Sequence, residues 1–128
     1  MIVFDASVLI AYLDGTDEHH SAAELLLAHA VDEEFGASPL TLAEVLVVPA
    51  RDGRLEAVQS ALRHLEIDEL PFPHGAAARL AQLRAATGLK MPDCCVLLVA
   101  EDAGATLASF DERLAQAAKD RDLVVLER

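Results

Sequence analysis

The sequence predicts an α/β protein built as three layers, α/β/α, around a mainly parallel central sheet of roughly four to five short strands. Three observations lead to this fold class. Short apolar runs rich in β-branched residues alternate along the chain with longer segments of helical periodicity. Glycine or proline stands at the ends of several helical segments. The chain has 128 residues without a repeat or linker, so residues 1–128 are expected to form a single domain.

Five segments have the composition of strands and seven have that of helices. We expect strands at 2–5, 33–38, 67–72, 105–110 and 123–127. We expect helices at 7–12, 19–30, 39–53, 54–65, 75–88, 91–104 and 111–121. Ser7 is expected to cap the first helix. In the second helix, the spacing i, i+3, i+4, i+7 predicts one face formed by Ala22, Leu25, Leu26 and His29.

The composition favours a cytoplasmic protein that is not associated with a membrane. No apolar stretch approaches the ~20 residues that a membrane span needs. The N-terminus has no basic region before its apolar run, and Asp5 interrupts that run, so a secretory signal is not expected. Cys94 and Cys95 are adjacent and cannot close a useful loop, so we interpret them as small buried residues in a reducing compartment.

The net charge of −12, from 22 acidic and 10 basic residues, limits the classes of partner. Affinity for nucleic acid comes largely from phosphate neutralisation, so this charge argues against a simple DNA- or RNA-binding module. It argues much less against a nuclease, because bound metal ions can invert the local potential. It also favours a basic protein partner.

Two interpretations are open for the arginines of the chain. Either they line the approach of RNA to the site, or they pair with carboxylates at the surface, and the second role is the commoner one. The arginines concerned are Arg51, Arg54, Arg63, Arg79 and Arg84. Lys90 either contacts phosphate near the acidic edge or is solvated at a helix end. No histidine has the i, i+4 spacing of a metal site with another histidine or cysteine, so solvated or packing roles are expected for all five.

Asp5 interrupts the first apolar run, "MIVFDASVLIAYL", where an ionised carboxylate would lose its water. Burial of an unpaired charge costs several kcal/mol or shifts the pKa until the group is neutral. Either a positive group compensates Asp5, or the residue is a strand-end turn or a helix cap. The sequence around Asp5 does not decide between these.

Three further acidic residues occupy comparable positions. Asp93 starts a helix, Asp111 follows a strand and starts another helix, and Glu44 is the charge within "LTLAEVLVV". In a parallel sheet the carboxyl ends of strands and the amino ends of helices share one edge, where ligands bind. Four carboxylates meeting there need compensation, which Mg²⁺ or Mn²⁺ supplies through oxygen ligands. Taken singly, Asp93 and Asp111 can instead be ordinary helix caps, and Glu44 an exposed helix residue.

The stretches "MIVFDASVLIAYL", "SPLTLAEVL" and "MPDCCVLLVAEDAGATLASFDERL" resemble the PIN domain, and among PIN domains the short VapC-type toxins of bacterial type II toxin–antitoxin pairs. The resemblance covers essentially the whole chain, in order and at the expected spacing. It implies a catalytic set of Asp5, Glu44, Asp93 and Asp111. Ser7 and Ser109 are candidate polar supports, where Ser109 replaces the threonine common in the family.

The resemblance also implies an activity, a cofactor and partners. The activity is Mg²⁺-dependent endoribonuclease cleavage, often of transfer or ribosomal RNA, with Mn²⁺ as an alternative metal. Asp5 and Asp93 are the expected metal ligands, while Asp111 completes the set and Glu44 ligates or positions water. The expected partners are the RNA substrate, a second copy of the chain in a homodimer, and a cognate VapB-type antitoxin in a hetero-oligomer.

Two other classes compete with this interpretation. Haloacid-dehalogenase-like phosphatases need a second Asp two residues after the first, where this chain has Ser7, and the paired acids and late lysine of receiver domains are missing. The other competitor is a catalytically inactive PIN fold that acts only by binding its partner. Substitution of Asp5 separates loss of activity from loss of partner binding.

Overall fold

The computed structural model describes residues 1–127 and confirms the predicted α/β fold with its parallel sheet. Within these residues, the strands form a five-stranded sheet in the order β3-β2-β1-β4-β5, and every adjacent pair is parallel. The strands are β1 (Ile2–Phe4), β2 (Phe35–Ala37), β3 (Ile67–Glu69), β4 (Thr106–Ala108) and β5 (Val125–Leu126). Each strand lies inside a predicted segment but is shorter than predicted.

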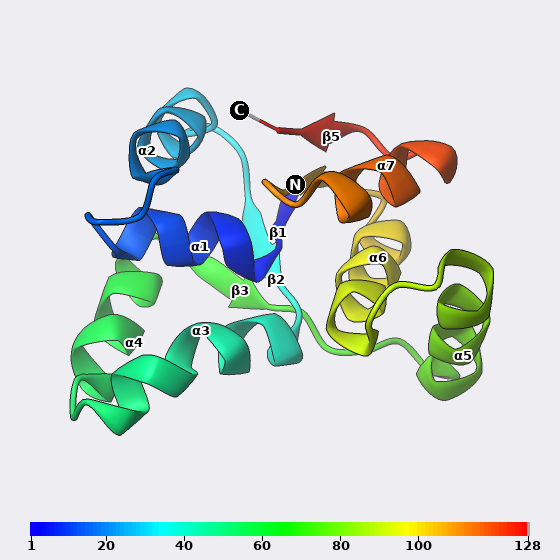
Figure 1. Ribbon diagram of the computed structural model, residues 1–128, viewed down its shortest axis with the longest axis horizontal. Helices are drawn as coiled ribbons and strands as arrows, with labels where there is room; N and C mark the ends of the chain where they lie inside the picture. Colours follow the sequence, from blue (N-terminus) through cyan, green and yellow to red (C-terminus); the bar gives the residue numbers. More distant parts are fainter. Residues whose placement is uncertain (128) are drawn as a thin grey trace.

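Helices cover both faces of the sheet, which gives the three predicted layers (Figure 1). The layer on one face consists of α1 (Ala6–Leu13), α2 (His20–His29), α3 (Pro39–Arg51) and α4 (Leu55–His64). The layer on the other face consists of α5 (Ala76–Thr87), α6 (Met91–Ala103) and α7 (Glu112–Asp120). No helix in residues 1–127 is long and apolar enough to cross a membrane.

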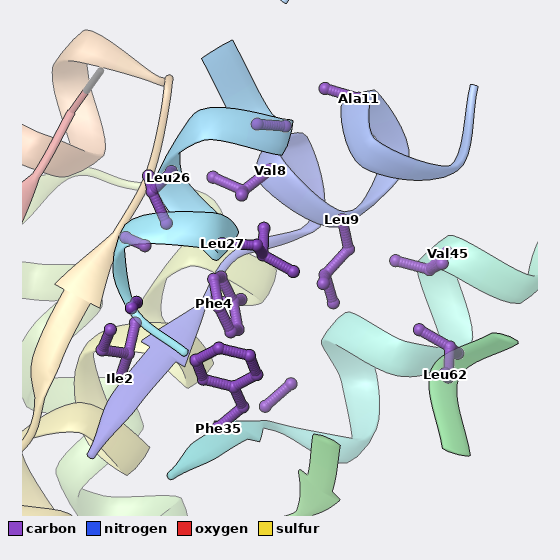
Figure 2. Close-up of a cluster of buried hydrophobic side chains, with 14 of the residues drawn as sticks. Ile2, Phe4, Val8, Leu9, Ala11, Leu26, Leu27, Phe35, Val45 and Leu62 are labelled. Carbon is purple, nitrogen blue, oxygen red and sulfur yellow. The ribbon is translucent and has the colours of Figure 1, made fainter. Parts of the chain in front are cut away.

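The alternation of side chains along β1 separates two apolar cores. Ile2 and Phe4 point into the core beneath α1–α4, while Val3 points into the core beneath α5–α7. In the first core, the rings of Phe4 and Phe35 meet edge to face, with centroids 5.0 Å apart and planes at 81° (Figure 2). Leu27 of α2 lies beside Phe4 in the same view, so α2 closes this core from above the sheet.

The second core is organised around α6, whose residues from Cys94 to Ala100 are all buried. Both cysteines are free thiols within this segment, in agreement with the sequence-based expectation of small buried residues. Lys90 precedes α6, and Gly104 ends it with a φ of 60°. The buried middle of α6 holds its first turn, which carries Asp93, at the carboxyl edge of the sheet.

Two local predictions are wrong. Asp5, rather than Ser7, caps α1: its side chain accepts the backbone N–H of Val8, while Ser7 lies inside the helix. The buried face of α2 consists of Ala23, Leu26, Leu27 and the following Ala30, and Leu25 is 60% exposed. The predicted spacing is right but its phase is displaced by one residue, because the placement of α2 over Phe4 decides which face is covered.

Candidate active site at the carboxyl edge of the sheet

Asp5 lies immediately after β1, at the centre of the sheet, and only 4% of its surface is exposed. One carboxylate oxygen, Oδ1, accepts the Ser7 hydroxyl at 2.6 Å and the Val8 N–H at 3.2 Å. The other, Oδ2, accepts the Ser109 hydroxyl at 2.5 Å. These are neutral donors, and no Lys, Arg or His within residues 1–127 forms an ion pair with Asp5.

The two serine hydroxyls join Asp5 to the loop that follows β4. Ser7 Oγ accepts the backbone N–H of Phe110 at 3.1 Å, and Ser109 Oγ accepts that of Asp111 at 3.0 Å. Because each hydroxyl accepts an amide hydrogen, its own hydrogen is free to point at Asp5. The network therefore holds the Asp5 carboxylate and orders the start of α7 at the same time.

The other three predicted acidic residues come from three different helices. Asp111 caps α7, with its Oδ1 accepting the N–H groups of Arg113 at 2.9 Å and Leu114 at 3.1 Å. Asp93 lies in the first turn of α6 and is half-buried. Glu44 is exposed on α3, which packs against both α1 and α6. The cap interpretation holds structurally for Asp5 and Asp111, but Asp93 is not the cap of α6.

The carboxylates are close enough to perturb one another electrostatically. Burial, opposed by the hydrogen bonds from Ser109, Ser7 and Val8, raises the pKa of Asp5, and the charge of Asp111 adds to this increase. Partial desolvation of the carboxyl group and then the Asp5 charge raise the pKa of Glu44, although the residue as a whole is exposed.

The pKa of Asp93 depends on all three of the other predicted acidic residues. Burial and then the charges of Asp111, Asp5 and Glu44 raise it from 3.8 to about 6, while Lys90 lowers it. The negative charges of the other three predicted acidic residues therefore all act on the Asp93 carboxyl group. The ionised form of Asp93 is therefore disfavoured relative to an ordinary aspartate, and a bound cation would favour it.

The donor set fits a hard divalent cation such as Mg²⁺. It offers carboxylate oxygens only, and neither Asp5 nor Asp93 has an ion-pair partner in the described part of the chain. In residues 1–127, however, no three His, Cys, Asp or Glu side chains are gathered as a ready-made metal-binding group. The fit thus rests on the chemistry of the donors and their mutual electrostatics.

Two of the five arginines considered from the sequence form ion pairs within residues 1–127, and a third binds a backbone carbonyl. Arg54 pairs with Asp52 at 3.4 Å, and Arg79 pairs with Asp102 at 3.5 Å. Arg84 donates to the backbone carbonyl of Leu89 at 2.7 Å, a contact that the sequence did not indicate. This bond fixes the segment that leads into α6 and Asp93.

Four of the five histidines make contacts with groups other than the four acidic residues. His20, His29 and His64 each place Nδ1 against a backbone carbonyl, at 2.7–2.8 Å. The ring of His19 packs against Phe110, with centroids 5.2 Å apart. These contacts agree with the packing roles expected from the sequence.

Sequence reasoning missed the two backbone amides that the serine hydroxyls accept, those of Phe110 and Asp111. The available signal was the pair of serines, each two residues from an Asp: Asp5-x-Ser7 and Ser109-x-Asp111. Their contact depends on β1 and β4 being neighbours, which the local sequence does not specify.

Several solved structures share this fold. FitAcB from Neisseria gonorrhoeae is 22% identical, with a TM-score of 0.75, and the alignment covers 99% of this chain and 97% of that one. VapBC2 from Rickettsia felis, bound to a DNA fragment from its promoter, is 17% identical, with a TM-score of 0.72 and coverage of 100% and 99%. VapC20 from Mycobacterium tuberculosis, described as a toxin that cleaves the sarcin-ricin loop, is 17% identical, with a TM-score of 0.68 and coverage of 91% and 95%.

The family model identifies the chain more directly than these distant structures do. No curated relative matches the sequence. The model of the PIN domain matches residues 2–120, a span that includes all four acidic residues and both serines. The parallel sheet with Asp5 and Asp111 following its neighbouring strands β1 and β4 is consistent with that match. The chain belongs to the PIN-domain family.

Proposed function

We propose that this protein is a metal-dependent endoribonuclease of the VapC type, the toxin of a toxin–antitoxin pair, acting in the cytoplasm. The observation that carries the proposal is the state of Asp5: a buried carboxylate, held by two serine hydroxyls, without an ion-pair partner in residues 1–127. Its electrostatic coupling to Asp93 and Asp111 supports a shared cation site. Family membership supports nuclease chemistry.

In the proposed site, Asp5 and Asp93 hold Mg²⁺ or Mn²⁺, and Asp111 and Glu44 complete the acidic set. When bound, such a metal activates water and stabilises the charge that develops on a phosphodiester. Ser7 and Ser109 keep both Asp5 oxygens in place, so that little reorganisation is needed when the cation binds. Glu44 is exposed and suited to orient water on the open side of the site.

The proposed partners follow from the same features. A cognate VapB-type antitoxin would silence the site with a basic side chain that competes for the carboxylates, and the net charge of −12 suits a basic partner. The toxin–antitoxin complexes among the structural neighbours support this choice of partner class. Transfer or ribosomal RNA is the proposed substrate, and a homodimer is the proposed assembly of the free toxin.

Cleavage by the protein free of antitoxin tests the proposal. End-labelled transfer and ribosomal RNA would be incubated with the wild type, Asp5→Asn and Asp32→Asn, each with Mg²⁺, Mn²⁺ or EDTA. Asp32 is an exposed aspartate outside the site, so Asp32→Asn is the charge-matched control. We expect metal-dependent cutting by the wild type and by Asp32→Asn, and none by Asp5→Asn.

The alternative, an inactive PIN fold that only binds its partner, predicts a different pattern. A folded wild type that cuts neither RNA class with either metal would favour this alternative. Weakened antitoxin binding by Asp5→Asn, without any activity to lose, would then identify the acidic cluster as a docking site.

A further inference from the structure

The charge of the chain is divided between its two helical layers. Residues 1–75, which include the α1–α4 layer, carry fourteen acidic side chains against three basic ones. Residues 76–121, which include the α5–α7 layer, carry six of each. A polyanion approaching the acidic edge therefore meets much less repulsion over α5–α7 than over α1–α4.

Within the α5–α7 layer, ion pairs occupy some cations and leave others available. Arg79 and Arg121 share Glu101, and Lys119 pairs with Glu127 at 2.7 Å. Lys90 and Arg113 are exposed, and neither pairs with a carboxylate within residues 1–127. These two cations are thus free to bind phosphate.

Both free cations adjoin the acidic residues. Lys90 immediately precedes α6 and is three residues before Asp93, whose pKa it lowers. Arg113 is two residues after Asp111, and its backbone N–H binds the Asp111 carboxylate at 2.9 Å. One cation therefore belongs to the start of α6 and the other to the start of α7.

A groove of about 480 Å³ lies between the residues at the end of α5 and those of α7, and it includes Arg113 from the first turn of α7 (Figure 1 shows both helices in one layer). Arg113 lies on its α7 wall and Leu89, the neighbour of Lys90, on its α5 wall. Arg121, just after the end of α7, also lines the groove, and among the lining residues within 1–127 the acidic one, Asp120, accepts a hydrogen bond from Gln116 at 3.0 Å. Three further lining residues, Ala86, Thr87 and Ala117, have small side chains without charge.

We infer that this groove holds the phosphate backbone of the RNA strand as it enters the acidic site, with Lys90 and Arg113 as the phosphate contacts nearest to that site. This inference rests on the proposed function and deepens it, because it assigns the direction of substrate approach and two positioning residues. Binding of this kind depends on charge rather than base sequence, so it sets affinity and orientation rather than the choice of cleavage sequence.

Salt-dependent binding of a single-stranded probe tests the inference. The full chain, free of antitoxin, would be titrated against a 5′-fluorescent oligouridine of about 12 nucleotides, a length within the range that such sites cover. EDTA prevents cleavage, and NaCl is varied from about 50 to about 200 mM. Fluorescence anisotropy gives the slope of the logarithm of the binding constant against the logarithm of salt concentration.

The test variant is the double substitution Lys90→Ala and Arg113→Ala, and its matched control is Arg51→Ala with Arg63→Ala. The control arginines are exposed in the α1–α4 layer, so both doubles remove two positive charges and have the same net charge. Each lost phosphate contact lowers the slope by about 0.7 for a single strand, so the test double should lose about twice that amount. The control double should keep the wild-type slope, and circular dichroism melts check that both are folded.

The outcomes separate this inference from the proposed function. Equal slopes for the two doubles, a larger loss in the control double, or no RNA binding by the wild type would overturn the inference. If the slopes are equal or the control double loses more, metal-dependent cleavage by the wild type would still support the proposed function. In the active enzyme, the single variant Arg113→Ala should raise KM for RNA more than it lowers kcat, because a backbone contact is made before and during the reaction.

Discussion

Ser109 Oγ donates a hydrogen bond to Asp5 Oδ2 across 104 residues of sequence, at 2.5 Å, and both side chains are buried. The bond joins the ends of the neighbouring strands β1 and β4. The same hydroxyl accepts the N–H of Asp111, so one serine links two of the four acidic residues. The pairing of β1 with β4 therefore fixes where the proposed metal site lies.

Removal of the Ser109 hydroxyl should weaken both the fold and the activity. Ser109→Ala leaves a buried Asp5 oxygen and the Asp111 N–H without this partner, which costs about 1–3 kcal/mol in the free energy of unfolding. Loss of the donor that most opposes the effect of burial should also raise the pKa of Asp5 further. Urea unfolding and RNA cleavage rates measure the two effects.

The control is Ser109→Thr, which keeps the hydroxyl and adds a methyl group. Cleavage by Ser109→Thr should stay closer to the wild type than cleavage by Ser109→Ala. If the alanine variant cleaves RNA as fast as the wild type, Ser109 does not support Asp5 in the reaction.

Asp5→Asn should abolish cleavage while maintaining or raising stability at neutral pH without metal. Burial raises the pKa of Asp5 in the folded state, so the folded protein binds this proton more tightly than the unfolded chain does. The stability associated with this group is present below its unfolded pKa and is lost as the pH rises through the folded pKa. Asn is neutral throughout and avoids that loss, which urea midpoints at pH about 7 would show.

With Mg²⁺ present, the wild type should become more stable than Asp5→Asn, because a cation bound to the folded state stabilises the wild type alone. Thermal melts with Mg²⁺ or EDTA measure this difference. Asp5→Ala is the contrasting variant: it leaves Ser7, Val8 and Ser109 without their acceptor and should be less stable than Asp5→Asn. A metal-independent melting temperature in the wild type would contradict metal binding at this site.

Binding of Mg²⁺ should strengthen as the pH rises through about 6, the pKa of Asp93 in the metal-free protein. A metal ligand must be deprotonated, and Asp93 is largely protonated below that pH. Because the pKa of Asp93 is higher in the folded state than in the unfolded chain, the metal-free protein should lose stability as the pH rises from 3.8 through about 6. Calorimetric titration with Mg²⁺ at several pH values and carbon-detected NMR of the Asp93 carboxyl group provide the measurements.

The comparison protein for this pH series is Asp93→Asn, which has no carboxyl group to titrate at this position. Its residual affinity for Mg²⁺ should vary less between pH about 5 and about 7. A wild-type affinity that is flat over the same interval would show that Asp93 does not bind the metal.

Gly36→Ala should destabilise the sheet by about 1–3 kcal/mol through overpacking. A Cβ atom at Gly36 would lie 2.6 Å from Leu70 Cδ1 and 2.9 Å from Leu70 Cγ, so the Leu70 side chain would have to move. Gly15→Ala is the control, since no atom lies within 4 Å of a Cβ atom there. Chemical unfolding of the two variants gives the difference, and equal stabilities would show that Leu70 moves without cost.

The double variant Gly36→Ala with Leu70→Ala isolates the clash itself. If the clash is the cause, the double variant is more stable than the sum of the two single effects predicts. Strict additivity would assign the loss at Gly36 to the backbone instead.

Local sequence patterns determined the element order and the identity of the acidic residues. The apolar run before Asp5, the strand before Asp111 and the glycines Gly88 and Gly104 predict elements that the structure contains. Strand and helix periodicities depend on neighbouring residues, so they can be recognised in one sequence without knowledge of distant contacts. The chemistry of four carboxylates likewise needs only their identity and their places at element ends.

The tertiary structure alone decided which of these elements meet. The sheet order brings β1 beside β4, so that Ser109 reaches Asp5, and the packing of α2 over Phe4 moves its buried face to Ala23. Packing in the other layer places Arg113 and Leu89, the neighbour of Lys90, along one groove, and within residues 1–127 neither Lys90 nor Arg113 forms an ion pair. Such relationships depend on long-range burial and on competition among many possible neighbours, which local periodicity does not encode.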